Sequence, residues 1–160
     1  MKARNLTRRR LRVYADTSVF GGCLDDEFKE HSRRFIEHVS QGRIVLLVSE
    51  IVLRELDRAP RAVVNVLEDL APSHVERFSL SLEVLRLRDF YLAEKILPRK
   101  WADDAMHVAA ATVARADAIV SWNFKHIVRL DKMKEYQRVN LQQGYGILTI
   151  ITPREVLPDD

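Results

Sequence analysis

The sequence has little cysteine or glycine, and it has no long hydrophobic run. Cys23 is the only cysteine in 160 residues, which excludes an internal disulfide and is typical of a reducing cytoplasm. No apolar stretch approaches the ~20 residues of a membrane span. The glycines at 21–22 and at 144 and 146 lack the Lys-Ser or Lys-Thr pair of a phosphate-binding loop. The basic beginning of the chain has no apolar core, so we expect no signal peptide and a cytoplasmic protein without a membrane anchor.

The composition is that of an ordinary globular protein, with 47% hydrophobic and 31% charged residues. We expect a single domain over residues 1–160, with residues 1–11 forming a basic arm. The net charge is only +3, yet a second group of cations lies late in the chain, at Lys125, Arg129, Lys132, Lys134 and Arg138. Such clusters are typical of proteins with a polyanionic partner, although a solvated face gives the same pattern.

Hydrophobic periodicity predicts short buried strands that alternate with helices. Strands are expected at residues 12–15, 44–48, 75–80, 119–121 and 147–151. Helices are expected at residues 26–41, 50–56, 60–70, 81–96 and 125–142, and from Asp103 to about residue 114. Gly21 and Gly22 should break the chain, and Leu82 and Phe90 should belong to the core. The alternation indicates an α/β fold with three layers, in which helices flank a mainly parallel sheet.

Three acids occupy equivalent places in this scheme. Asp16 ends the first strand, Glu55 lies on the helix after the second strand, and Asp104 begins the helix before the fourth strand. Because right-handed crossovers bring helix N-termini to the carboxyl edge of a parallel sheet, all three should meet there. A bound cation would offset the repulsion between these carboxylates. A site made only of carboxylate oxygens favours Mg²⁺ or Mn²⁺ over zinc. Each acid taken alone is more often a helix cap or a surface charge.

The chain resembles a PIN-domain nuclease, and more narrowly a VapC-like toxin of a type II toxin–antitoxin system. The matching stretches are VYADTSVF at 13–20, SEIVLREL at 49–56, ADDAMHVAAATVARADAIVSWNF at 102–124 and ITPREVL at 151–157. The resemblance implies a metal-dependent endoribonuclease that cleaves single-stranded RNA with Mg²⁺ or Mn²⁺ and leaves 5′-phosphate and 3′-hydroxyl ends. It also implies that the first and fourth strands are neighbours, and it implies a cognate antitoxin and a homodimer as partners.

Carried over by position, the resemblance makes Asp16, Glu55 and Asp104 the metal ligands and Ser18 their polar partner. The fourth acidic position of the family is often Asp and here is Asn123, which brings no charge. The alternative is therefore a PIN scaffold that binds RNA or protein without cleaving it. A haloacid-dehalogenase-like phosphatase needs a second acid two residues after the first, where this chain has Ser18, and the paired acids of a receiver domain are also missing.

Two aromatic residues near the acids have competing interpretations. His107, one turn after Asp104, is more often a hydrogen-bonded packing residue than a metal ligand. Trp122, next to Asn123, is expected to be buried beneath the site rather than to stack on a base.

Overall fold

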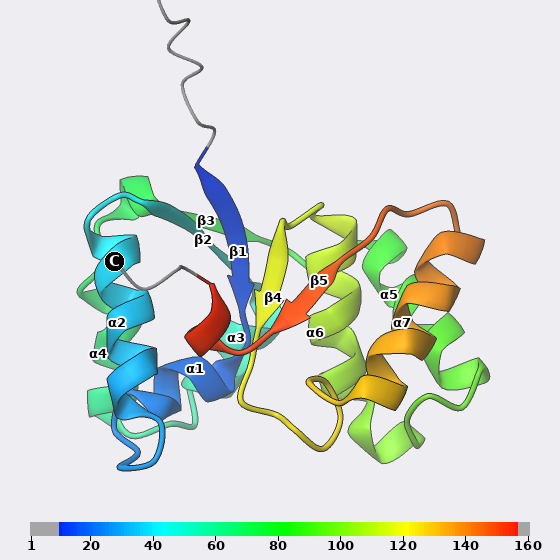
Figure 1. Cartoon of the computed structure of the whole chain (residues 1–160), viewed down its shortest axis with the longest axis horizontal. Coiled ribbons are helices and arrows are strands. Elements are labelled where there is room, and N and C mark those ends of the chain that lie inside the picture. The colour runs from blue at the N-terminus through cyan, green and yellow to red at the C-terminus, as the bar shows by residue number, and fades with distance from the viewer. Residues whose placement is uncertain (1–9, 157–160) are drawn as a thin grey trace, which may run out of the picture.

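The computed structural model describes residues 10–156 and shows a five-stranded sheet in which all paired strands are parallel (Figure 1). The strands lie in the order β3-β2-β1-β4-β5. Their bounds are β1 Leu11–Ala15, β2 Ile44–Ser49, β3 Val75–Phe78, β4 Ala118–Val120 and β5 Thr149–Ile151. The first and fourth strands are neighbours, as the resemblance implied.

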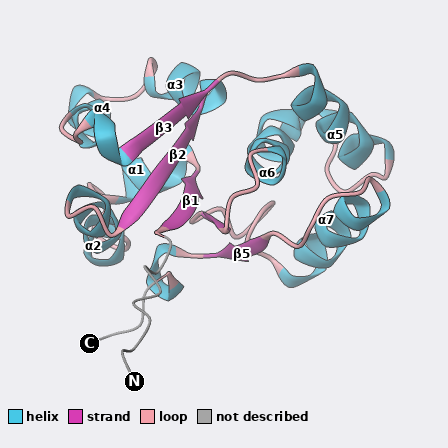
Figure 2. Cartoon of the chain, turned by 90° about the horizontal axis from the view of Figure 1, so that it is seen from above, coloured by secondary structure: helices cyan, strands magenta, loops and turns pink. Residues whose placement is uncertain are grey.

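Helices cover both faces of the sheet. Seen from above, α2 and α4 lie on one side, and α5, α6 and α7 lie on the other (Figure 2). The helices are α1 Thr17–Gly22, α2 Lys29–Ser40, α3 Glu50–Leu56, α4 Arg61–Glu68, α5 Leu82–Ala93, α6 Ala102–Val113 and α7 Leu130–Gln142. Three single 3₁₀ turns are Pro72–His74, Arg99–Trp101 and Pro153–Glu155. This arrangement confirms the expected three-layer α/β fold.

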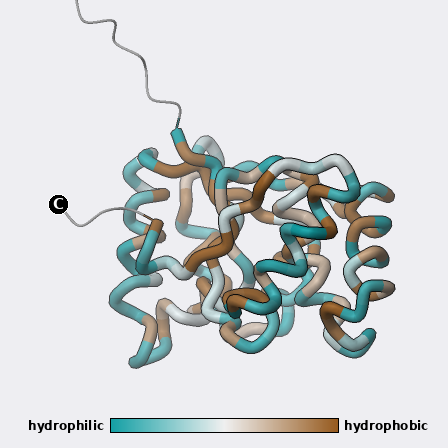
Figure 3. The backbone as a smooth tube through the Cα atoms, turned by 45° about the vertical axis from the view of Figure 1, so that its right-hand side comes forward, coloured by the Kyte–Doolittle hydropathy of each residue, from teal (hydrophilic) through white to brown (hydrophobic). Residues whose placement is uncertain are grey.

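The centre of the sheet forms the core. All six residues of β2 are buried, as are Val13, Tyr14 and Ala15 of β1. The edge strand β3 is partly exposed. A strand covered on both faces needs an unbroken apolar sequence, and residues 44–48 have one, which predicts this strand. Coloured by hydropathy, the chain shows hydrophobic segments toward its interior and hydrophilic ones along its outer helices (Figure 3).

The central helix α6 lies close to the sheet because its middle is made of small residues. Ala109, Ala110 and Ala111 are fully buried, and α6 contacts β2, β4 and α5. Right-handed connection places the beginning of α6 at the carboxyl edge of the strands, so Asp103 and Asp104 lie in its first turn there.

Gly21 and Gly22, which were expected to break the chain, are the last two residues of α1, and the helix ends after them. A Cβ atom on Gly22 would lie 2.5 Å from Ser32 Oγ and 2.8 Å from Trp122 Nε1. Glycine is therefore needed at position 22 because α1 approaches α2 and the loop after β4 closely.

The expected core face of α5 is also partly wrong. Leu82 and Phe90 are 62% and 44% exposed, whereas Val84, Leu87 and Tyr91 are buried. The leucines of this helix lie on more than one side of it, so their spacing does not determine which side faces α6 and α7. Within residues 10–156, no helix is both long and apolar enough to cross a membrane.

Candidate functional site

The carboxyl edge of the sheet gathers the three predicted acids. Asp16 follows β1 directly, and its backbone N–H donates to the carbonyl of Val120 at the end of β4, at 3.3 Å. Glu55 lies on α3, which follows β2 without a loop, and Asp104 lies in the first turn of α6. Parallel strands end at one edge, so these three elements deliver their side chains to one region.

Asp16 is buried, with 4% of its surface exposed, and two serines hold its carboxylate. Ser18 Oγ donates to Oδ1 at 2.5 Å, and Ser121 Oγ donates to Oδ2 at 2.7 Å. Each serine in turn accepts a backbone N–H at 2.9 Å, from Trp122 and Asn123 respectively. Burial raises the pKa of Asp16, and the charge of Glu55 adds to this, while His107 and the serines oppose it. Ser121, which the sequence analysis missed, is therefore the counterpart of the predicted Ser18.

Glu55 is held by a buried histidine. Its carboxylate forms an ion pair with His107 Nε2, and the Glu55 side chain is 36% exposed while that of His107 is 2% exposed. His107 Nδ1 lies 2.7 Å from the Tyr14 hydroxyl, which lies 2.6 Å from Ser49 Oγ. His107 is therefore a buried, hydrogen-bonded residue, as expected. Ser49 occupies the N-cap position of α3, but its side chain makes no cap hydrogen bond and contacts Tyr14 instead.

The pair of Glu55 and His107 favours its charged form. Burial alone would lower the pKa of His107, but the hydrogen bond to Glu55 and the negative charges of Asp16, Glu55 and Asp104 raise it overall. Burial alone would raise the pKa of Glu55, but the hydrogen bond and charge of His107 lower it overall. The negative charges of all three acids therefore act on one histidine at this edge.

Asp104 is held by a histidine that the sequence analysis missed. Asp104 Oδ2 lies 2.7 Å from His126 Nδ1, and the Asp104 side chain is 23% exposed. Asn123 Oδ1 accepts backbone N–H groups from Lys125 at 3.2 Å and His126 at 2.9 Å. The amide oxygen of Asn123 therefore shapes the loop that carries His126.

Asp103 points in another direction from Asp104. Its side chain lines a groove of about 340 Å³ together with Glu55, Arg54 and Arg58. Asp103 is exposed, while Asp104 is partly buried and contributes to the raised pKa of His107. The two adjacent acids thus share the edge but face different neighbours, as their separation of roughly 100° around a helix requires.

The donor types at this edge fit a hard divalent cation, because Asp16, Glu55 and Asp104 all offer carboxylate oxygens. The raised pKa of Asp16 is the mark of a buried carboxylate with too little positive charge beside it. Among the described residues, no group of three His, Cys, Asp or Glu side chains is arranged closely enough to hold a metal ion. Histidines hold two of the acids, and serines hold the third.

Trp122 is buried, as expected. It is 9% exposed, its Nε1 donates to Ser32 Oγ at 2.7 Å, and its ring stacks on Phe28 at 4.4 Å between centroids. It supports the loop after β4 from below and does not present a face for a base.

Three of the five cations of the late basic cluster form ion pairs or hydrogen bonds within the fold. Arg129 pairs with Asp131, Lys132 Nζ donates to the carbonyl of Ile96 at 2.7 Å, and Arg138 pairs with Glu94 and Glu135. Most of the basic arm, residues 1–11, lies outside the described residues; Arg12, which follows the arm, forms an ion pair with Glu76 at 2.8 Å.

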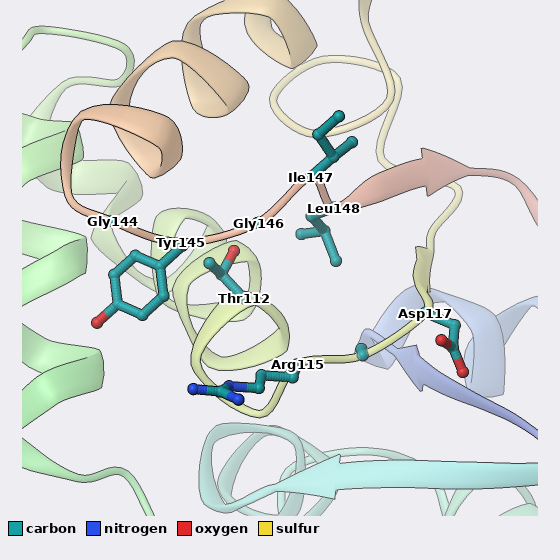
Figure 4. A pocket seen from close by; sticks show the side chains of 9 residues that line it. Thr112, Arg115, Asp117, Gly144, Tyr145, Gly146, Ile147 and Leu148 are labelled. Atoms are coloured by element: carbon teal, nitrogen blue, oxygen red, sulfur yellow. The ribbon is translucent and has the colours of Figure 1, made fainter.

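A separate hollow of about 430 Å³ lies at the other end of the sheet (Figure 4). Thr112, Arg115 and Asp117 line it from the end of α6 and the loop before β4, and Tyr145 and Leu148 line it from the segment before β5. It contains none of the acids discussed above.

The five parallel strands and their flanking helices define an α/β protein with PIN-like topology. Residues 12–125 match the PIN domain family, so the chain belongs to the PIN-domain family, whose members are nucleases. A comparison with curated proteins found no significant match.

Solved structures share the fold. VapBC2 from Rickettsia felis, bound to a DNA fragment from its promoter, is 14% identical with a TM-score of 0.55, over 88% of this chain and 98% of that one. DNA-bound VapBC from Salmonella typhimurium is 19% identical with a TM-score of 0.53, over 89% and 98%. Mycobacterium tuberculosis VapC20, a toxin that cleaves the sarcin–ricin loop, is 15% identical with a TM-score of 0.51, over 71% and 92%.

Proposed function

We propose that this protein is a metal-dependent endoribonuclease that cleaves single-stranded RNA and acts as a toxin neutralised by an antitoxin. The observation that carries the proposal is the buried Asp16 at the carboxyl edge, with Glu55 and Asp104 electrostatically coupled to it through His107. A buried carboxylate beside a second acid is costly to keep charged, and a divalent cation bound for a polyanionic substrate would offset that cost.

Asp16, Glu55 and Asp104 would hold Mg²⁺ or Mn²⁺. When bound, such an ion polarises the phosphoryl oxygen and stabilises the charge that develops as water displaces the leaving oxygen. Ser18 and Ser121 fix both oxygens of the Asp16 carboxylate. His107 and His126 orient Glu55 and Asp104. The products should carry 5′-phosphate and 3′-hydroxyl ends.

The proposed substrate and protein partners come from the similarity to the VapBC and VapC20 structures. Two of the similar structures are VapBC complexes, and a third is a toxin that cleaves an RNA loop. We extend these properties to this chain and propose RNA as its substrate, an antitoxin protein as its inhibitor, a homodimer as its assembly and the cytoplasm as its location.

A second candidate function is a PIN scaffold that binds RNA or protein without cleaving it. Asn123 favours it, because it brings no charge to the fourth acidic position and its amide oxygen already accepts two backbone N–H groups. The intact trio of Asp16, Glu55 and Asp104 favours the enzyme.

A cleavage assay separates the two functions. Purified protein is incubated with a pool of unstructured RNA in Mn²⁺, in Mg²⁺ and in EDTA, and the end groups of the fragments are determined. The enzyme cleaves with either ion, stops in EDTA and leaves 5′-phosphates. Full activity in EDTA, or rescue by zinc alone, contradicts the proposal. Binding of the pool without cleavage in any ion supports the scaffold.

A further inference from the structure

Two aromatic side chains are exposed beside the acidic edge. Trp101, at the beginning of α6, is 37% exposed, and Phe124, in the loop after β4, is 50% exposed. A single exposed ring is ordinary on a protein surface, but two rings beside a polar site offer faces on which a flat ligand can stack.

Other rings of the site hold both side chains in place. The Trp101 ring lies 4.6 Å from the ring of His126, the histidine that contacts Asp104. The Phe124 ring lies 6.3 Å from Phe28 and from Trp122, which stack on each other beneath the loop. Each exposed ring therefore contacts other rings of the site: Trp101 contacts His126 of the loop after β4, and Phe124 belongs to that loop.

Unpaired cations accompany the two rings. Lys100 Nζ lies 5.3 Å from the centre of the Trp101 ring, and Lys125 follows Phe124 in the chain. Both lysines are exposed, and neither ammonium forms a hydrogen bond or ion pair within residues 10–156. Arg129, Lys132 and Arg138 of the late cluster have partners within the fold, whereas Lys125 of the same cluster keeps an available positive charge beside Phe124.

We propose that Trp101 and Phe124 stack on unpaired RNA bases beside the acidic site, while Lys100 and Lys125 contact the adjoining phosphates. Aromatic faces combined with cations that follow the backbone are how proteins hold single strands without reading a sequence. A duplex keeps its bases stacked and cannot offer them to either ring. This inference rests on the proposed function, and it makes the two rings the source of the preference for unpaired RNA.

Binding measured in EDTA tests the rings separately from cleavage. The probe is a fluorescein-labelled, unstructured 12-nucleotide RNA, and fluorescence anisotropy gives its affinity for the wild type, Trp101→Leu and Phe124→Leu. Loss of one base–aromatic stack should weaken binding by roughly 5- to 100-fold. Trp101→Phe and Phe124→Tyr, which keep a ring, should restore most of the affinity.

Phe90→Leu is the matched control, because Phe90 is 44% exposed on α5 among Glu83, Arg86 and Tyr145 and should bind as the wild type does. Near-ultraviolet circular dichroism checks that each variant is folded. An abasic strand of the same length and an RNA duplex should bind the wild type and the leucine variants equally weakly.

The outcomes distinguish this inference from the proposed function. The inference is overturned if the leucine variants bind RNA as tightly as the wild type does. It is also overturned if the leucine substitutions lower the affinity for the abasic strand as much as the affinity for RNA. Either result holds even if the protein cleaves RNA with Mn²⁺. Ring-dependent binding by a protein that cleaves nothing in any ion supports the stacking surface and overturns the nuclease.

Discussion

Replacing His107 with leucine should lower the free energy of unfolding by about 2–4 kcal/mol. A hydrogen bond to a charged group contributes about 1.5–3 kcal/mol. The 36% exposure of Glu55 places this pair toward the lower value, because solvent screens it. Loss of the contact between His107 Nδ1 and Tyr14 adds about 1 kcal/mol, and Tyr14 keeps Ser49 as a partner. For a domain of this size the melting temperature should fall by about 5–12 °C.

The effect should depend on pH with a defined sign. The pKa of His107 is raised in the folded protein, so its contribution is complete below the unfolded value of about 6.5 and is lost as pH rises through the folded pKa. The pKa of Glu55 is lowered, so its contribution is present above about 4.3 and is lost as pH falls through the folded pKa. The cost of His107→Leu should therefore be largest between about pH 4.5 and 6.5.

Urea unfolding of metal-free protein at pH 5.5, 7 and 9 measures this cost. Arg54→Leu is the control, because Arg54 pairs with Glu50 at 2.9 Å while 61% and 42% of the two side chains are exposed. Such a pair contributes about 0.5 kcal/mol or less. A His107→Leu cost that is as small as the control, or that is the same at all three pH values, refutes a charged pair between His107 and Glu55.

Two further substitutions test the edge of the sheet and the support of its loop. Asp104→Asn should abolish RNA cleavage in a folded protein. Asp103→Asn should only remove a negative charge from the first turn of α6, at a cost of about 0.3–1 kcal/mol, and leave most activity, as cleavage rates and thermal unfolding will show. Gly22→Ala should cost about 1–3 kcal/mol, because the new methyl group would lie 2.8 Å from the indole nitrogen of Trp122; urea unfolding and tryptophan fluorescence measure this cost.

An inactive Asp103→Asn beside an active Asp104→Asn contradicts the assignment of the first turn of α6. A Gly22→Ala protein with unchanged stability and fluorescence contradicts the close packing of α1 against Trp122.

The layout of the edge could be predicted because the family resemblance implied that the first and fourth strands are neighbours, and the handedness of the crossovers implied the rest. Buried parallel strands are continuous apolar runs, so residues 44–48 identify one directly. Once β1 and β4 end at the same edge, Asp16 and the residues after Val120 must be close. The helix that begins with Asp103 and Asp104 reaches that edge for the same reason.

The partners of the acids could not be predicted, because periodicity gives a residue's face but not its neighbour. Ser121 lies 105 residues from Asp16, and His126 lies 22 residues from Asp104 in a loop without a repeating pattern. Their polar side chains are ordinary for a loop. Only the packed chain shows that they hold carboxylates.

Two features depend on tertiary packing and could not be predicted from the local sequence. Glycine is required at position 22, in the last turn of α1, because Trp122 leaves no room for a side chain, and nothing near position 22 in the sequence indicates this. The orientation of α5 depends on Tyr91, whose hydroxyl donates to Asn140 on α7. The hydrogen bond of Tyr91 requires this side of α5 to face α7, and the positions of the leucines alone do not indicate that orientation.

The initial rate of cleavage of unstructured RNA against Mn²⁺ concentration, for the wild type and Asp16→Asn, tests the central claim most directly. The asparagine variant keeps the size of the buried side chain, removes its charge and replaces one of the two oxygens that accept from Ser18 and Ser121 with an NH₂ donor, so near-ultraviolet circular dichroism must first show that the variant is folded. The account predicts a rate that rises with Mn²⁺ and saturates for the wild type, and no cleavage at any Mn²⁺ concentration for Asp16→Asn. A folded Asp16→Asn protein that cleaves at the wild-type rate contradicts it.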